Sequence, residues 1–145
     1  MARHIYSCPL RWSDMDAFGH VNNAVFLSYL EEARIDFMFR LAPGDGSPSF
    51  KGGSVVARHE IDYLRPLVHR YEPVTIETWV TRIGASSTTV SYEVKDADAT
   101  YVRASTVVVP IDLETGRPRR LTEEEKVLLE QYRDEAPDSE EAVAA

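Results

Sequence analysis

The segment 23–40 is the feature that most constrains the fold of this chain. Its apolar residues recur at the three- and four-residue spacing of one helical face. Further apolar residues widen this stripe, so the predicted helix needs cover over most of its circumference. Such a helix would be about 27 Å long. The main face consists of Phe26, Tyr29, Leu30, Ala33 and Phe37.

After this helix the hydrophobic period changes from 3.6 to 2. We therefore predict four further strands that form a meander, after a first strand at 4–12. A Thr-x-x-Glu capping box at Thr122 predicts a short final helix. This order favours an α+β fold, in which a curved antiparallel sheet packs around the one long helix. The four strands are expected near residues 55–64, 74–80, 88–94 and 100–111.

The length of 145 residues fits a single domain, which we place at residues 1–133. Residues 134–145 carry five acidic side chains and no Lys or Arg, and we expect this tail to be disordered. The tail accounts for most of the net charge of −8, so the rest of the chain is nearly balanced. A duplex-binding protein would present a basic face, and we therefore expect no nucleic-acid partner.

A single cysteine, Cys8, excludes an intrachain disulfide and a cysteine-based metal cluster. The amino-terminal residues lack the apolar run of a signal peptide. No segment approaches the roughly 20 apolar residues of a membrane span. These observations predict a cytoplasmic protein that has neither a metal site nor a membrane partner.

The loop 14–23 concentrates the residues that carry chemistry. Two carboxylates, Asp14 and Asp16, precede His20 and the helix-capping residues Asn22 and Asn23. The loop thus brings a carboxylate and an imidazole to the positive end of the long helix. A hydrolase acting on a carbonyl needs this combination, which offers a base or nucleophile and donors for the developing oxyanion.

Several stretches resemble the hotdog-fold acyl-CoA thioesterases of the 4-hydroxybenzoyl-CoA thioesterase type. The resemblance covers most of residues 5–112, and its matches follow the order of that family. It implies a hotdog fold, and paired protomers whose active sites lie across their interface, in a homodimer or a homotetramer. The matching stretches are Arg11-Trp-Ser-Asp-Met-Asp-Ala-Phe-Gly-His-Val-Asn-Asn, Tyr29-Leu-Glu-Glu-Ala-Arg34, Ile61-Asp-Tyr-Leu-Arg-Pro66 and Arg82-Ile-Gly-Ala-Ser-Ser87.

The resemblance implies that Asp16 acts as general base or as nucleophile, while His20 and Asn22 orient the substrate. Asp14 is assigned a structural role. No cofactor is expected, because coenzyme A belongs to the substrate. Arginine side chains bind phosphate well, and turn residues can contact the pantetheine arm. The candidates for binding coenzyme A are Arg65, Arg82, Gly84, Ser86 and Ser87.

Three alternatives to an acyl-CoA thioesterase remain open. The first is a thioesterase for an acyl carrier protein, which would dock on a basic patch such as Arg117, Arg119 and Arg120. The second is a non-catalytic hotdog protein that binds acyl-CoA, although such a protein could dispense with Asp16. The third is a hydratase of the same fold.

Overall fold

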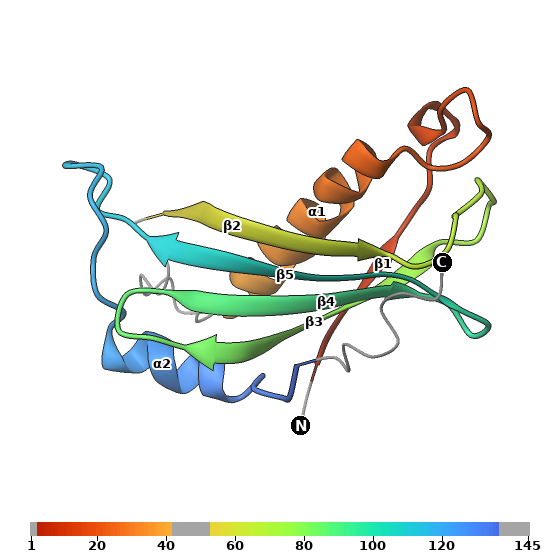
Figure 1. Cartoon of the computed structure of the whole chain (residues 1–145). Coiled ribbons are helices and arrows are strands. Elements are labelled where there is room, and N and C mark those ends of the chain that lie inside the picture. The colour runs from red at the N-terminus through yellow and green to blue at the C-terminus, as the bar shows by residue number, and fades with distance from the viewer. Residues whose placement is uncertain (1–2, 42–52, 137–145) are drawn as a thin grey trace.

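The computed structural model describes residues 3–41 and 53–136. A five-stranded antiparallel sheet packs one face against the long helix α1, and a short helix α2 covers one end (Figure 1). This arrangement is the predicted hotdog fold. The elements are β1 His4–Cys8, the 3-10 turn η1 Trp12–Asp14, α1 Asn23–Leu41, β2 Ser54–Tyr63, β3 Val74–Ile83, β4 Thr88–Lys95, β5 Thr100–Pro110 and α2 Glu123–Glu130.

The strand order is β1-β3-β4-β5-β2, which corrects the predicted four-strand meander. Only β3, β4 and β5 follow one another as neighbours, and β2 pairs with β5 at the edge of the sheet. The connection 64–73 therefore crosses from one side of the sheet to the other instead of turning back. Leu67 anchors this crossover, because its side chain is buried and its carbonyl accepts the Val21 N–H at 2.7 Å.

The predicted helix is confirmed, and its main apolar face lies in the core. Leu30, Ala33 and Phe37 have no exposed surface, and Phe26 and Tyr29 are almost fully buried. They face the inward side chains of the strands, which alternate with outward ones along β3, β4 and β5. The first strand is shorter than predicted, because β1 ends at Cys8, directly before Pro9.

The predicted capping box of α2 is also confirmed. Thr122 Oγ1 accepts the Glu125 N–H, and the Glu125 carboxylate accepts the Thr122 N–H. The chain after α2 then pairs with β3 beyond the end of β1, where Val80 bonds through its N–H to the Tyr132 carbonyl and through its carbonyl to the Asp134 N–H. This segment supplies backbone partners that β1 is too short to provide.

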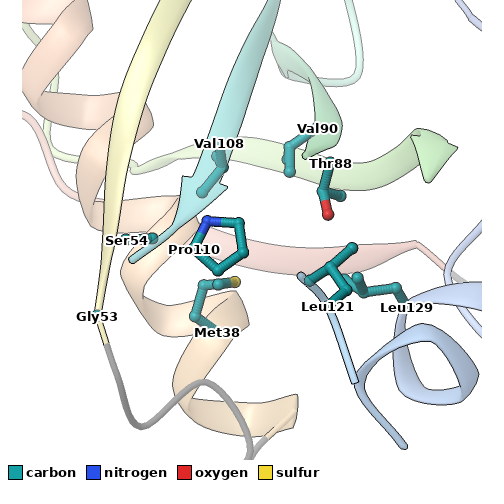
Figure 2. A pocket seen from close by; sticks show the side chains of 9 residues that line it. All are labelled: Met38, Gly53, Ser54, Thr88, Val90, Val108, Pro110, Leu121 and Leu129. Carbon is teal, nitrogen blue, oxygen red and sulfur yellow. The ribbon is translucent and has the colours of Figure 1, made fainter. Parts of the chain in front are cut away.

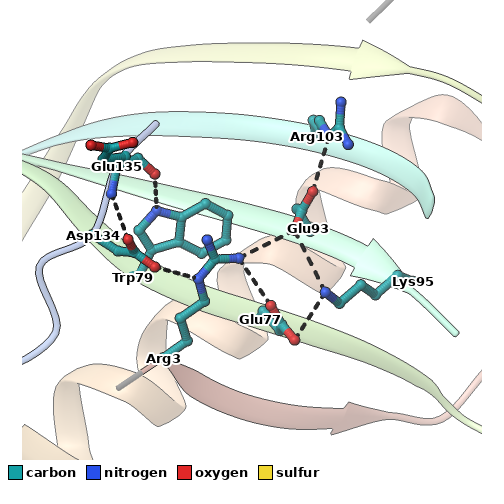
Figure 3. Close-up of polar contacts among 8 residues, drawn as sticks. All are labelled: Arg3, Glu77, Trp79, Glu93, Lys95, Arg103, Asp134 and Glu135. Atoms are coloured by element: carbon teal, nitrogen blue, oxygen red, sulfur yellow. Dashed lines mark hydrogen bonds and ion pairs between the residues drawn. The ribbon is translucent and has the colours of Figure 1, made fainter. Parts of the chain in front are cut away.

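The outer face of the sheet carries an ionic network centred on Arg3 (Figure 3). The Arg3 guanidinium contacts Glu77, Glu93 and Asp134 within 3.3 Å and lies 3.7 Å from the centroid of the Trp79 ring. Trp79 is buried and donates its indole N–H to the Glu135 carbonyl. The first residues of the predicted acidic tail therefore fasten the chain across the sheet, while residues 137–145 lie outside the described part.

Part of α1 and almost all of β2 are left exposed. The apolar side chains of Leu27, Ile35 and Phe39 are 39%, 46% and 75% exposed on α1. Nine of the ten residues of β2 are exposed, although its neighbour β5 is buried at alternate positions. None of the described helices is long and apolar enough to cross a membrane.

Phe37 packs where α1 meets the segment after α2, since its ring lies edge-on to Tyr132 at 5.0 Å. We expect Phe37→Ala to lower the free energy of unfolding by about 3–5 kcal/mol, because a fully buried ring would leave a cavity. Phe18→Ala, which removes a ring that is 85% exposed, should change it by less than about 0.5 kcal/mol. Urea denaturation measures both, and equal losses would contradict this account of the core.

Candidate active site

The loop before α1 is a small closed hairpin. Met15 and Val21 form an isolated antiparallel bridge, and the Asp16 N–H donates to the His20 carbonyl at 2.9 Å. Gly19 occupies the turn with φ +81°, a conformation that L side chains rarely adopt. Asp16 and His20 are therefore backbone partners at the turn end of the hairpin.

Asp14 holds this loop against the protein. Its side chain is 2% exposed and accepts hydrogen bonds from the Arg11 guanidinium at 2.8 Å and from the Tyr29 hydroxyl at 2.7 Å. Burial alone would raise the pKa of Asp14, but these hydrogen bonds outweigh it and hold the pKa below its ordinary value. The Asp14 carbonyl also accepts the Asn22 N–H. The carboxylate and the carbonyl of Asp14 are therefore both used in hydrogen bonds that hold the loop in place.

Asp16 is half-buried and faces solvent beside the helix. Its Oδ1 accepts the Phe18 N–H at 2.9 Å, and its Oδ2 accepts a hydrogen bond from Asn22 Nδ2 at 3.3 Å. Two donors therefore fix the orientation of the carboxylate, while its remaining lone pairs point to open space. Such a group is positioned to receive a proton or to attack an electrophile.

Asn22 is the N-cap of α1, because its Oδ1 accepts the Ala24 N–H at 2.8 Å. One side chain therefore both caps the helix and bonds to Asp16. The Asn23 N–H has no acceptor among the described residues. A free N–H at the positive end of the helix dipole favours a partial negative charge placed there.

These groups border an open hollow of about 710 Å³, within the range of about 300–1,000 Å³ typical of small-molecule sites. Its floor is apolar and aromatic, and the Tyr63 hydroxyl donates to the Asn23 carbonyl at 3.0 Å, which ties the end of β2 to the start of α1. The lining residues are Asp16, Phe18, His20, Val21, Asn22, Asn23, Phe26, Tyr63, Leu64, Arg65 and Pro66.

The predicted site residues divide into two groups. Asp16, His20, Asn22 and Arg65 line this one hollow. The other predicted residues for coenzyme A, Arg82, Gly84, Ser86 and Ser87, lie at the end of β3 and in the turn to β4. That turn is at the opposite end of the sheet from the hollow (Figure 1), so within one protomer these residues do not join the Asp16 group.

The remaining candidates serve other contacts. Arg119 binds both carboxylate oxygens of Glu125 at 2.8 and 2.9 Å. Cys8 is buried, and burial raises the pKa of its thiol to about 12, which makes it a poor nucleophile. Among the described residues, no three His, Cys, Asp or Glu side chains lie close enough together to hold a metal ion.

A second cavity lies near the other end of α1 (Figure 2). Its volume is about 20 Å³, room for about one water molecule. No carboxylate, imidazole, amine or thiol lines it, and its polar side chains are the hydroxyls of Ser54 and Thr88. The lining residues are Met38, Gly53, Ser54, Thr88, Val90, Val108, Pro110, Leu121 and Leu129.

Sequence reasoning did not identify Phe18, Tyr63 and Pro66 as parts of the site. Phe18 lies inside the motif loop, and an aromatic residue at an exposed loop tip could have indicated a binding contact. Tyr63 and Pro66 come from the end of β2 and the crossover, and no local pattern tells which strand end meets the start of a helix.

The residues around the hollow lie within a segment that known proteins share. Residues 10–136 match the model of the thioesterase-like superfamily. The chain belongs to this superfamily. The match begins just before the Asp14–Asp16 loop and ends at the last described residue, so it includes every residue of the hollow.

Individual members are similar over most of their length. The chain is 27% identical to a predicted thioesterase from Bacillus stearothermophilus, with a TM-score of 0.82 and coverage of 94% of this chain and 100% of that one. It is 35% identical to a thioesterase from Thermus thermophilus crystallised with coenzyme A and zinc, with a TM-score of 0.75 and coverage of 88% and 92%. The protein YsmA of Bacillus subtilis (strain 168) is 34% identical over 122 residues, 83% of this chain and 80% of YsmA.

The Asp14 contacts predict a pH-dependent contribution to stability. A carboxyl group whose pKa is lowered by folding stabilises the fold above its unfolded pKa of about 3.9, and this contribution is lost as the pH falls through the folded value. We expect Asp14→Asn to lower the free energy of unfolding by about 1–3 kcal/mol at neutral pH, with a deficit that shrinks below about pH 4.

Urea denaturation at neutral and acidic pH measures this deficit, with Asp98→Asn, on an exposed turn, as the control. A deficit of the same size at both pH values would contradict the role given to the Asp14 charge.

Proposed function

We propose that this protein hydrolyses acyl-CoA thioesters in the hollow around Asp16, releasing a free acid and coenzyme A. The observation that carries the proposal is the placement of one oriented carboxylate beside the free N–H at the amino end of α1. Membership in the thioesterase-like superfamily supports a thioester as substrate. The Thermus relative crystallised with coenzyme A supports a CoA ester in particular.

Two routes fit this placement of Asp16. As general base, the carboxylate takes a proton from water, and the water oxygen attacks the thioester carbon. As nucleophile, it attacks that carbon itself to form a mixed anhydride, which water then hydrolyses. Either way the carbon–sulfur bond breaks and the thiolate leaves, later taking up a proton. A thiolate needs less protonation on departure than an amine does, so no strong general acid is required.

The Asn23 N–H would stabilise the oxyanion that forms in either route. It points from the first turn of α1, where the dipole of the whole helix favours negative charge. Asn22 orients Asp16 and starts the helix at the same time, so the carboxylate and the oxyanion donor are held in a fixed relation. His20 borders the hollow and would orient the substrate.

We further propose that two protomers associate through the free edge of β2. A ten-residue edge strand presents unpaired N–H and C=O groups, which native proteins normally cover. The exposed apolar side chains of Leu27, Ile35 and Phe39 on α1 would be buried by the same contact. Antiparallel pairing of β2 with its copy would continue the sheet through both protomers.

Asp16→Asn should lower turnover by about 10²–10⁴-fold, the usual contribution of one acid–base group. The amide oxygen can still accept the Phe18 N–H, so the loop should keep its shape. The measurement is thiol release from acetyl-, hexanoyl-, palmitoyl- and benzoyl-CoA. Glu124→Gln, at an exposed position on α2, is the control and should retain full turnover. Wild-type rates in Asp16→Asn would refute the role of Asp16.

Val56→Asp should dissociate the dimer, because it places a carboxylate from each copy in the proposed contact. Val127→Asp is the matched control, since Val127 is 62% exposed on α2, away from that edge. Sedimentation velocity should show a dimer for wild type and the control and a monomer for Val56→Asp. A wild-type monomer would exclude the proposed association.

A further inference from the structure

We infer that the β2 dimer is centred on His59, which faces its own copy across the two-fold axis, and that protonation of this imidazole pair dissociates the dimer. The inference rests on the dimer proposed above, and it adds the register of the contact and its dependence on pH. His59 lies on the free edge strand and is not among the residues that line the hollow around Asp16.

The side chains of β2 divide between the two faces of the sheet. His59 lies opposite Thr106 of β5, and Thr106 is fully buried, so His59 is on the face that is turned towards α1. After the bulge between Val56 and Arg58 the pairing with β5 is regular, and Ile61 therefore shares the face of His59. The opposite, outer face of this stretch carries the three charged residues Arg58, Glu60 and Asp62.

A second copy that continues the sheet must match these faces. In an antiparallel pair, residues directly opposite each other point to the same face, so an inner residue of β2 lies opposite an inner residue of the copy. A two-fold axis then sets one residue opposite itself, and the residues before and after it lie opposite each other. The residue at the axis therefore defines the register of the dimer.

The charges on the outer face select this residue within the stretch 58–62. With His59 at the axis, Arg58 lies opposite the partner's Glu60, and the same ion pair repeats on the other side of the axis. An axis at Arg58, Glu60 or Asp62 would set that charge against its own copy. An axis at Ile61 would set Glu60 against the partner's Asp62 twice. Like charges directly opposite destabilise a strand pair, so the register centred on His59 is favoured.

Arg58 and Glu60 are available for this contact. Both side chains are exposed, and they form an ion pair with each other within one protomer. Exposed ion pairs contribute little on their own, so exchanging this pair for two pairs across the dimer costs little. The contact with the copy gains specificity from them, because they oppose every other register.

The surroundings of His59 within one protomer favour its neutral form. Its Nδ1 lies 2.8 Å from Thr106 Oγ1. Burial lowers the pKa of His59, and the Arg34 guanidinium on α1 lowers it further, whereas Glu31 on the same helix acts in the opposite sense. Arg34 is fixed in place, because it donates to the Tyr92 hydroxyl at 3.3 Å and lies 3.8 Å from Glu31.

In the dimer a second imidazole joins these groups. Opposite side chains of an antiparallel pair have Cβ atoms about 4.5–5.5 Å apart, so two imidazolium groups at the axis would repel each other beside two Arg34 guanidinium groups. Arg58 and Glu60 lie on the other face of the sheet and neutralise each other there. The dimer therefore binds fewer protons than two separate protomers, and by linkage it must weaken as the pH falls through the range in which His59 titrates.

Sedimentation velocity over a series of protein concentrations at pH 7.5 and 5.5 measures this effect. The dissociation constant of the wild-type dimer should rise by roughly tenfold or more at pH 5.5, because both imidazoles must lose a proton when the dimer forms. His59→Gln keeps a group that can bond to Thr106 but does not titrate, and it should dimerise equally well at both pH values. His69→Gln, on the crossover 64–73, is the matched control and should keep the wild-type pH dependence.

Charge exchange on β2 tests the register. Arg58→Glu makes the outer face of the strand wholly acidic, and Glu60→Arg makes it mainly basic. Each variant alone should dimerise roughly tenfold more weakly, since like charges then lie opposite. An equimolar mixture of the two should form heterodimers with about the wild-type affinity. Asp62→Asn, which removes a charge that lies outside the two ion pairs, should leave the dissociation constant nearly unchanged.

Each outcome bears on one claim. A wild-type dissociation constant that is the same at both pH values, or a pH dependence that persists in His59→Gln, would overturn the inference. So would Arg58→Glu and Glu60→Arg variants that form no heterodimer, or a wild-type protein that is monomeric at pH 7.5. A dimer that shows the expected pH dependence but releases thiol from no acyl-CoA of the panel would overturn the proposed activity alone.

Discussion

The buried Asp14 carboxylate is the interaction on which the site depends. It joins Arg11 before the loop to Tyr29 in the second turn of α1, so it fixes where the loop meets the helix. The Asp14 carbonyl then receives the Asn22 N–H, and Asn22 both caps α1 and orients Asp16. A buried charge costs free energy unless it is hydrogen-bonded. The contacts that satisfy Asp14 also fix the loop that carries the solvent-facing carboxylate of Asp16.

The sheet and α1 leave one edge and one side of the protomer uncovered. Its core is closed on α1 by β3, β4 and β5, and α2 covers one end, yet the β2 edge and one side of α1 stay open. The hollow lies at one end of that edge, beside Tyr63. The dimer proposed above would bury this open surface.

The sequence predicted the elements and the motif loop well, because their signals are local. The helical spacing through Phe37, the capping box at Thr122 and the Asp-x-Asp loop each depend on a few adjacent residues. The pairing of β2 with β5 was not predictable in this way, because alternation is the same in edge and central strands. The contribution of Tyr63 to the hollow depends on that pairing. The burial of Asp14 beside a half-buried Asp16 follows from the tertiary contact of Asp14 with Tyr29.

The central claim is that acyl-CoA reacts at the amino end of α1. The most direct test is a crystal structure of Asp16→Asn with bound benzoyl-CoA. The account predicts the thioester carbonyl oxygen within hydrogen-bonding distance of the Asn23 N–H, with its carbon facing residue 16. A thioester bound elsewhere, such as in the apolar cavity beside Met38, would contradict it.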